Sequence, residues 1–166
     1  MIDFKVENKA KMRTLPTLHH VHGGDSLLFF NDKTGTLTFE TSLCLTPFMI
    51  RRDLMAALQD AGSTIHDLDK SDILPLPAFA VEGGTLAPVC FLLNDRLVAV
   101  TLTASSVGQK TALTGEQQRA FLFASFRAKD PCPDTLRNCI LHGGFGSITL
   151  CTDPRSGHAS ARIAWS

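Results

Sequence analysis

The sequence has no net charge and no long apolar run. Its 16 Lys and Arg residues balance 16 Asp and Glu residues, so no whole-molecule field favours nucleic acid or an anionic membrane. No apolar run approaches the roughly 18 residues of a membrane-spanning helix. The charged start of the chain, with Asp3, Lys5 and Glu7, differs from a signal peptide. We therefore expect a cytoplasmic protein that uses neither nucleic acid nor a membrane as its partner.

Motifs with a defined chemistry are also missing. The sequence contains no Gly-rich phosphate loop, no dinucleotide fingerprint, no Gly-x-Ser-x-Gly nucleophile elbow and no zinc-deaminase pattern. Paired carboxylates, which could divide general acid and base work between them, are scarce. These absences argue against an enzyme, so we expect no cofactor and assign no catalytic residue.

The sequence has five cysteines, an odd number. Without a secretory signal, this favours reduced thiols in a cytosolic setting. Cys132 and Cys139 lie near His142, so a thiol–imidazole nucleophile pair is an alternative to simple packing there. The other three lie in apparent strands, where a free thiol mostly acts as a small hydrophobe: Cys44, Cys90 and Cys151.

The strongest pattern that is present is a pair of apolar runs around Asn94-Asp95, within residues 89–103. Asn and Asp tolerate positive φ, so this pair suits a two-residue hairpin turn. The predicted strands are apolar on both faces, and such strands are usually central and covered on both sides. We therefore expect a central hairpin whose second cover is the N-terminal arm or a partner chain.

Further elements are predicted on either side of this hairpin. Residues 26–41 and 145–165 each suggest a hairpin, with an Asp, a basic residue, a hydroxyl residue and a Gly in the turn. Thr46-Pro47 and Gly62 bracket an apolar stripe of helical spacing, which predicts an amphipathic helix. A capping box at residues 114–117 predicts a second, nearly all-apolar helix, and a short helix is expected over residues 134–141.

The order hairpin, helix, hairpin, helix, hairpin predicts an α+β fold. The simplest packing is a mostly antiparallel sheet of about six strands, in three hairpins, with two main helices packed on one face. The length of 166 residues fits a single domain, 1–166. Residues 1–25 carry little pattern and are expected to form a flexible N-terminal arm.

Three aspartates, Asp67, Asp69 and Asp72, cluster in a predicted loop. The loop lacks the Gly and the final Glu of a calcium-binding hand. A local acidic patch on a neutral protein fits a binding surface for a basic protein partner, and the alternative is a solvated acidic loop. We predict these three aspartates as partner-binding residues.

His19, His20 and His22 define an alternative site. A spacing of two residues places imidazoles on one side of an extended segment, as metal sites do, and His66, His142 or a cysteine could add a third ligand. No second cluster with ligand spacing follows, so no metal is assigned. A small metal- or thiol-dependent hydrolase that uses this segment is the alternative function.

Two parts of the chain resemble small bacterial proteins of unknown function. The first comprises residues 37–39 (Leu-Thr-Phe) and 43–47 (Leu-Cys-Leu-Thr-Pro), which lead into an Arg-Asp-Leu helix. The second comprises residues 153–157 (Asp-Pro-Arg-Ser-Gly) and 159–163 (Ala-Ser-Ala-Arg-Ile). Some small α+β proteins of this kind are immunity proteins, which bind and neutralise a cognate toxin. The resemblance implies a shape and transfers no catalytic residue.

The leading hypothesis is therefore a non-enzymatic protein-binding module of the immunity-protein type, with a bacterial toxin as its partner. Occluding or mimicking a site needs surface rather than chemistry. A structural or chaperone-like subunit is a further alternative, because the two-faced central hairpin would suit assembly. In that case a homodimer is a candidate state.

Overall fold

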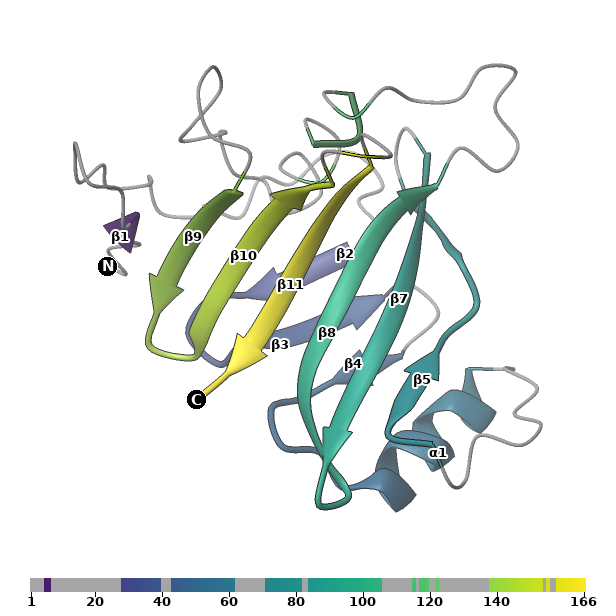
Figure 1. The fold of residues 1–166 in the computed structure, drawn as a ribbon. Helices are drawn as coiled ribbons and strands as arrows, with labels where there is room; N and C mark the ends of the chain where they lie inside the picture. Colours follow the sequence, from purple (N-terminus) through teal and green to yellow (C-terminus); the bar gives the residue numbers. More distant parts are fainter. Residues whose placement is uncertain are drawn as a thin grey trace.

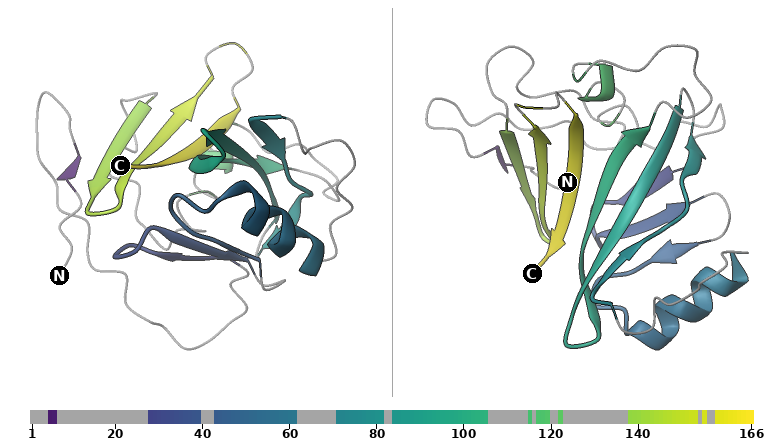
Figure 2. Two further views of the ribbon diagram at one scale, coloured as in Figure 1. Left: turned by 90° about the horizontal axis from the view of Figure 1, so that it is seen from below. Right: turned by 45° about the vertical axis from the view of Figure 1, so that its right-hand side comes forward.

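A large and a small antiparallel sheet lie face to face (Figures 1 and 2). The structure is a computed structural model, and it describes residues 5–6, 28–39, 43–61, 71–81, 84–105, 115, 117–119, 122, 138–153, 155 and 158–166. Helix α1 (Arg51–Asp60) lies at the end of this sandwich where the central hairpin turns. The inner face of the large sheet is the one that faces the small sheet, and the opposite face is called the outer face.

The large sheet has eight strands, and every pair in it is antiparallel. In spatial order they are β1 (Lys5–Val6), β9 (Asn138–Gly143), β10 (Gly146–Thr152), β11 (Ala159–Trp165), β8 (Arg96–Ser105), β7 (Gly84–Leu93) and β5 (Ile73–Pro75), while β6 (Phe79–Val81) also pairs with β7. The three-stranded sheet comprises β2 (Leu28–Asn31), β3 (Thr36–Phe39) and β4 (Cys44–Leu45), and it lies behind the large sheet in Figure 1.

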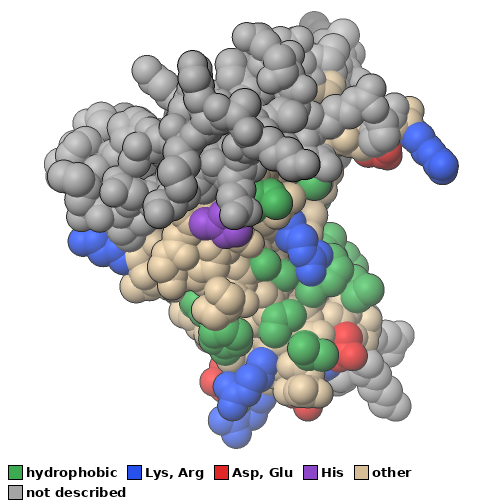
Figure 3. Space-filling view, turned by 60° about the vertical axis from the view of Figure 1, so that its left-hand side comes forward, with side chains coloured by type: hydrophobic (Ala, Val, Ile, Leu, Met, Phe, Trp, Pro, Cys, Tyr) green, Lys and Arg blue, Asp and Glu red, His purple; other side chains and the backbone are tan. Residues whose placement is uncertain are grey.

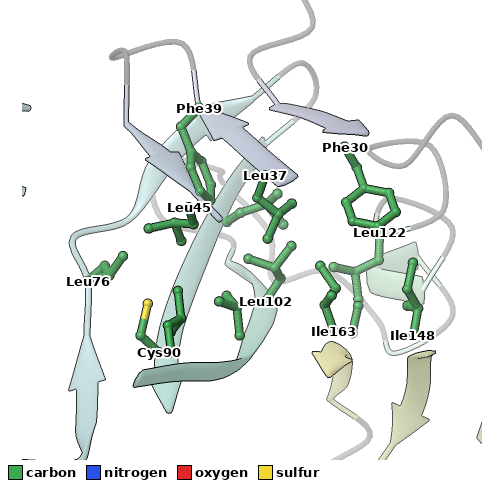
Figure 4. Close-up of a cluster of buried hydrophobic side chains, with 14 of the residues drawn as sticks. Phe30, Leu37, Phe39, Leu45, Leu76, Cys90, Leu102, Leu122, Ile148 and Ile163 are labelled. Carbon is green, nitrogen blue, oxygen red and sulfur yellow. The ribbon is translucent and has the colours of Figure 1, made fainter. Parts of the chain in front are cut away.

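The core fills the space between the two sheets (Figure 4). Leu37 and Phe39 of β3 are buried and alternate with half-buried threonines, as expected for a strand with one covered face. They point toward side chains of the large sheet, which include Cys90, Leu102 and Ile163. Full burial of one such side chain contributes roughly 1.5–3 kcal/mol, so this interface is the main source of stability.

A tryptophan joins the C-terminal strand to the first hairpin. The Trp165 indole Nε1 donates a hydrogen bond of 2.8 Å to the carbonyl oxygen of Gly35, in the β2–β3 turn. Gly35 has a φ of 72°, and a Cβ there would lie 2.7 Å from Trp165 Nε1. Phe30 and Phe145 meet edge to face beside this contact, with ring centroids 5.0 Å apart. The turn glycine thus supplies both the left-handed conformation and the room that the indole needs.

The central hairpin forms as predicted. Asn94 and Asp95 adopt φ values of 50° and 60°, which match a two-residue turn with both central residues left-handed. Strands β7 and β8 are interior strands of the large sheet, paired outward with β5 and β11. Their inner face is buried, whereas Val89 and Phe91 on the outer face are only half-buried. The small sheet therefore covers the inner face of this hairpin, and the described residues leave its outer face partly exposed.

The hairpins at residues 26–41 and 145–165 are also confirmed, by the β2–β3 and β10–β11 pairs. The prediction of one sheet is wrong, because β2–β3 belongs to a second sheet. The short helix expected over residues 134–141 is wrong where the chain is described: residues 138–143 form strand β9. Its inward side chains, Cys139 and Leu141, pair with Leu150 and Ile148 of β10, so a partner strand decided the conformation.

The predicted arrangement of two main helices on one face is not what the described residues show. Helix α1 begins at Arg51, not at Pro47, because Phe48 has a φ of 57° and Ile50 makes a bridge with Arg96. In the second predicted helix, Gly115, residues 117–119 and Leu122 are helical. Of the expected N-terminal arm, Lys5–Val6 pairs with β9, and the rest lies outside the described residues.

Within the described part of the chain, no helix has the length and apolar composition needed to span a membrane.

Candidate functional site

Arg51, the first residue of α1, connects three segments at one end of the sandwich. Its Nε donates a hydrogen bond of 2.6 Å to Asp95 Oδ1 in the β7–β8 turn. Its Nη2 donates 2.8 Å to Asp72 Oδ1, and its Nη1 donates 2.7 Å to the carbonyl oxygen of Ser71. The Arg51 backbone N–H also donates to the Asp95 carbonyl oxygen, at 2.8 Å. One guanidinium therefore orders the helix start, the hairpin turn and the segment before β5.

The guanidinium is largely enclosed, whereas its two carboxylates face solvent. The Arg51 side chain is 16% exposed, and the side chains of Asp72 and Asp95 are 70% and 74% exposed. The hydrogen bond with Asp95 is the main cause that raises the pKa of Arg51, and burial acts in the opposite direction. Exposed ion pairs contribute little to stability, so the main effect of this arrangement is to fix two carboxylates in space.

Two large apolar side chains lie exposed next to these carboxylates. Ile73 is 55% exposed and follows Asp72, and Leu93 is 62% exposed and precedes the turn that holds Asp95. The two segments are joined, because Leu92 N–H donates a 2.8 Å hydrogen bond to the Asp72 carbonyl oxygen. We call the set Arg51, Asp72, Asp95, Ile73 and Leu93 the Arg51 corner. Apolar side chains beside fixed polar groups are typical of interaction surfaces.

An open depression of about 690 Å³ adjoins this corner along α1. Its lining contains guanidinium groups and a carboxylate but no Ser, Thr, Cys or His: Ile50, Arg51, Arg52, Met55, Ala56, Gln59 and Asp95. Nothing in this lining can serve as a side-chain nucleophile with an adjacent base.

The structure places one of the three predicted partner-binding residues. Asp72 lies in the Arg51 corner, whereas Asp67 and Asp69 lie outside the described residues. Asp95 belongs to the same corner, but the sequence marked it only as a turn residue. Arg51 likewise appeared only as part of the polar face of a helix. The chain distance between these two, 44 residues, explains why no local pattern revealed the pair.

The alternative sites are only partly within the described chain. His19, His20 and His22 lie outside it, so the metal-site alternative stays a prediction. Among the residues that are described, no group of three or more His, Cys, Asp or Glu could hold a metal ion. Cys132 is also outside this set. Cys139 is buried on the inner face of β9, and His142 is exposed on the outer face, so these two side chains lie on opposite faces of the sheet.

No protein-family model, no curated protein and no solved structure matches the chain. The Arg51 corner and the surfaces next to it are therefore the features from which a function is inferred.

Proposed function

We propose that this chain is a cytoplasmic, non-enzymatic protein-binding module whose contact surface includes the Arg51 corner. The observation that carries the proposal is the exposure of Ile73 and Leu93, at 55% and 62%, beside two carboxylates held by one guanidinium. Apolar anchors with a polar rim are the usual anatomy of protein interfaces.

The fixed carboxylates support a basic partner. Arg51 holds Asp72 and Asp95 through one oxygen each, and the second oxygen of each carboxylate has no hydrogen bond to a described residue. Groups that are ordered before binding lose less conformational entropy on association. Asp67 and Asp69 precede Asp72 closely in the chain and add to its acidic character. Together these features favour Lys or Arg side chains on the partner.

Within this class we propose an immunity protein that neutralises a cognate bacterial toxin. The support is the resemblance of residues 37–39, 43–47, 153–157 and 159–163 to small bacterial proteins, some of which have that role. Neutralisation by occlusion needs a rigid surface and no reacting group. The product of the neighbouring coding sequence is the first partner to test. Stoichiometric binding, measured by calorimetry with both purified proteins, is expected; no binding contradicts the toxin-neutralising form.

Two variants test the contact surface itself. Leu93→Asp removes an exposed apolar anchor, and Asp72→Lys reverses a fixed charge; each is expected to weaken partner binding by about tenfold or more. Arg155→Glu is the matched control, because Arg155 is exposed in the β10–β11 turn, away from the corner. Unchanged affinity in both corner variants, with their melting temperatures intact, would show that the corner is not the contact surface.

A further inference from the structure

The outer face of the large sheet carries an arginine between two threonines. Arg162 of β11 is exposed, and its direct cross-strand neighbours are Thr149 of β10 and Thr101 of β8. Directly opposite residues in antiparallel strands have Cβ atoms about 4.5–5.5 Å apart, so both hydroxyls flank the base of the arginine side chain. The residues before and after Arg162, Ala161 and Ile163, are buried on the inner face.

The Arg162 guanidinium is held in place by an aromatic ring rather than by an acid. Its Cζ lies 4.4 Å from the centroid of Phe91, on β7. Strand β8 lies between β11 and β7, so the Arg162 side chain crosses β8 to reach the ring. This explains why Ala99, the outer-face partner of Phe91 on β8, is only 1% exposed. Stacking of this kind orders the guanidinium while leaving its N–H donors available to a ligand.

The charge on this sheet has one sign. None of its eight strands contains Asp or Glu, whereas they contain Lys5, Arg96 and Arg162. Arg96 pairs with Leu93 across the hairpin. Among the described residues, neither Arg96 nor Arg162 has a salt bridge. Figure 3 shows this side of the molecule, with a basic side chain set among hydrophobic ones and acidic side chains toward the lower end of the view.

We propose that the outer face binds an acidic segment of the protein partner, with a carboxylate on the Arg162 guanidinium, where it lies over Phe91 on the Thr101 side of β11. The inference rests on the proposed function, since it names the chemistry of that partner. A guanidinium binds a carboxylate through two parallel N–H donors, and the hydroxyl of Thr101 on β8 can add a third. Apolar side chains of the same segment would pack on Phe91, Val89 and Ile73, which share this face.

Charge complementarity favours this occupant over the others. A second copy of the chain, packed through the same face, would present strands that contain Lys and Arg but no Asp or Glu, whereas a two-fold interface must be self-complementary. Nucleic-acid binding needs several clustered basic side chains, whereas Arg162 has apolar residues around it. An acidic segment that also has apolar side chains can pair with the Arg162 guanidinium and pack on the apolar residues around it.

The test is an NMR titration of the ¹⁵N-labelled full chain with poly-L-glutamate, with poly-L-lysine and an oligo-dT as comparison probes. Poly-L-glutamate is expected to shift the amides of Phe91, Thr101 and Arg162. Arg162→Gln is expected to weaken this binding on the order of tenfold, because a charge-assisted hydrogen bond is lost. Arg162→Lys keeps the charge but loses the planar guanidinium, so its affinity for poly-L-glutamate should lie between those of the native chain and Arg162→Gln.

Arg155→Gln is the matched control, because it removes the same charge from the exposed β10–β11 turn and should leave the affinity unchanged. Four results would each overturn the inference: poly-L-glutamate does not bind; it shifts only amides of other strands; Arg155→Gln loses as much affinity as Arg162→Gln; or oligo-dT binds more tightly at the same amides. Asp72→Lys is expected to retain binding of poly-L-glutamate. If poly-L-glutamate does not bind at Arg162, the inference about the outer face is wrong, but the binding tests with the Leu93 and Asp72 variants are unaffected.

Discussion

At the scale of the residue, Cys90 shows how burial in the core lowers the reactivity of a thiol. This thiol is buried in β7, faces the small sheet, and has its pKa raised to about 12 by desolvation. The thiolate is the reactive form of cysteine, so Cys90 is effectively inert at neutral pH. Cys44 and Cys151 are only partly buried, and they offer the thiols that reagents reach first among the described cysteines.

Cys90 also makes stability depend on pH. The unfolded thiol titrates near 9.0 and the folded one near 12, so between these values the folded state holds a proton that the unfolded state loses. Its contribution is fully present below pH 9.0 and declines as the pH rises toward 12. Urea unfolding between about pH 8 and pH 10 should show a shallower decline for Cys90→Ala than for the native chain, by up to about 1.4 kcal/mol per pH unit. Parallel curves would contradict this.

At the scale of the element, two glycines at the β9–β10 turn, Gly144 and Gly146, differ in the room around them. Gly146 has a φ of 134°, and a Cβ there would lie 2.1 Å from the backbone oxygen of Ala164. That oxygen belongs to the sheet and cannot move aside. Around Gly144, by contrast, a Cβ would meet nothing within 4 Å.

These two glycines give a matched pair of substitutions. Gly146→Ala is expected to lower the free energy of unfolding by about 2–4 kcal/mol, because the side chain would push β10 from β11 and the backbone angle is strained for alanine. Gly144→Ala is expected to change it by less than about 0.5 kcal/mol. Chemical denaturation followed by circular dichroism measures both. Equal effects of the two substitutions would show that the close approach to Ala164 does not matter.

At the scale of the whole molecule, the buried core lies between the sheets, and the residues proposed to bind a partner lie on the outside. Leu102 and Leu93 belong to the same hairpin, but Leu102 is fully buried against the small sheet and Leu93 is 62% exposed. Leu102→Ala is expected to cost about 2–5 kcal/mol, and Leu93→Ala less than about 0.5 kcal/mol. Urea midpoints compare them directly. A large cost for Leu93→Ala would mean that the exposed side chain supports the fold and would weaken its assignment to binding.

The predictable part of the fold is the part that depends on neighbours in the chain. Asn94 and Asp95 closed their turn as expected, because left-handed backbone is a property of those residues themselves. The assignment of residues 28–39 to a separate sheet depends on strands far away in sequence. Residues 138–143 have apolar positions that fit a helix or a strand, and pairing with β10 decided between them. The local sequence pattern could not predict which sheet residues 28–39 join or that residues 138–143 pair with β10.

The same limit applies to the surfaces. Asp72 could be chosen from the sequence because it has acidic neighbours. Arg51 and Asp95 could not, since their contact spans 44 residues of chain. Arg162 stood in an alternating strand with no acid or aromatic next to it, and its ring partner lies on a strand two positions away in the sheet. Long-range contacts, which create both surfaces, are the information that single-sequence patterns do not carry.

The hydrogen bond from Trp165 to Gly35 has a practical consequence. The chain has one tryptophan, and its indole lies buried where the first hairpin meets the C-terminal strand. Its fluorescence therefore comes from a single point on the seam between the sheets. A red shift of this emission that precedes the loss of far-ultraviolet ellipticity would reveal an intermediate in which the sheets have parted while their strands stay paired. Coincident transitions would show that docking of the sheets and formation of their strands are one cooperative event.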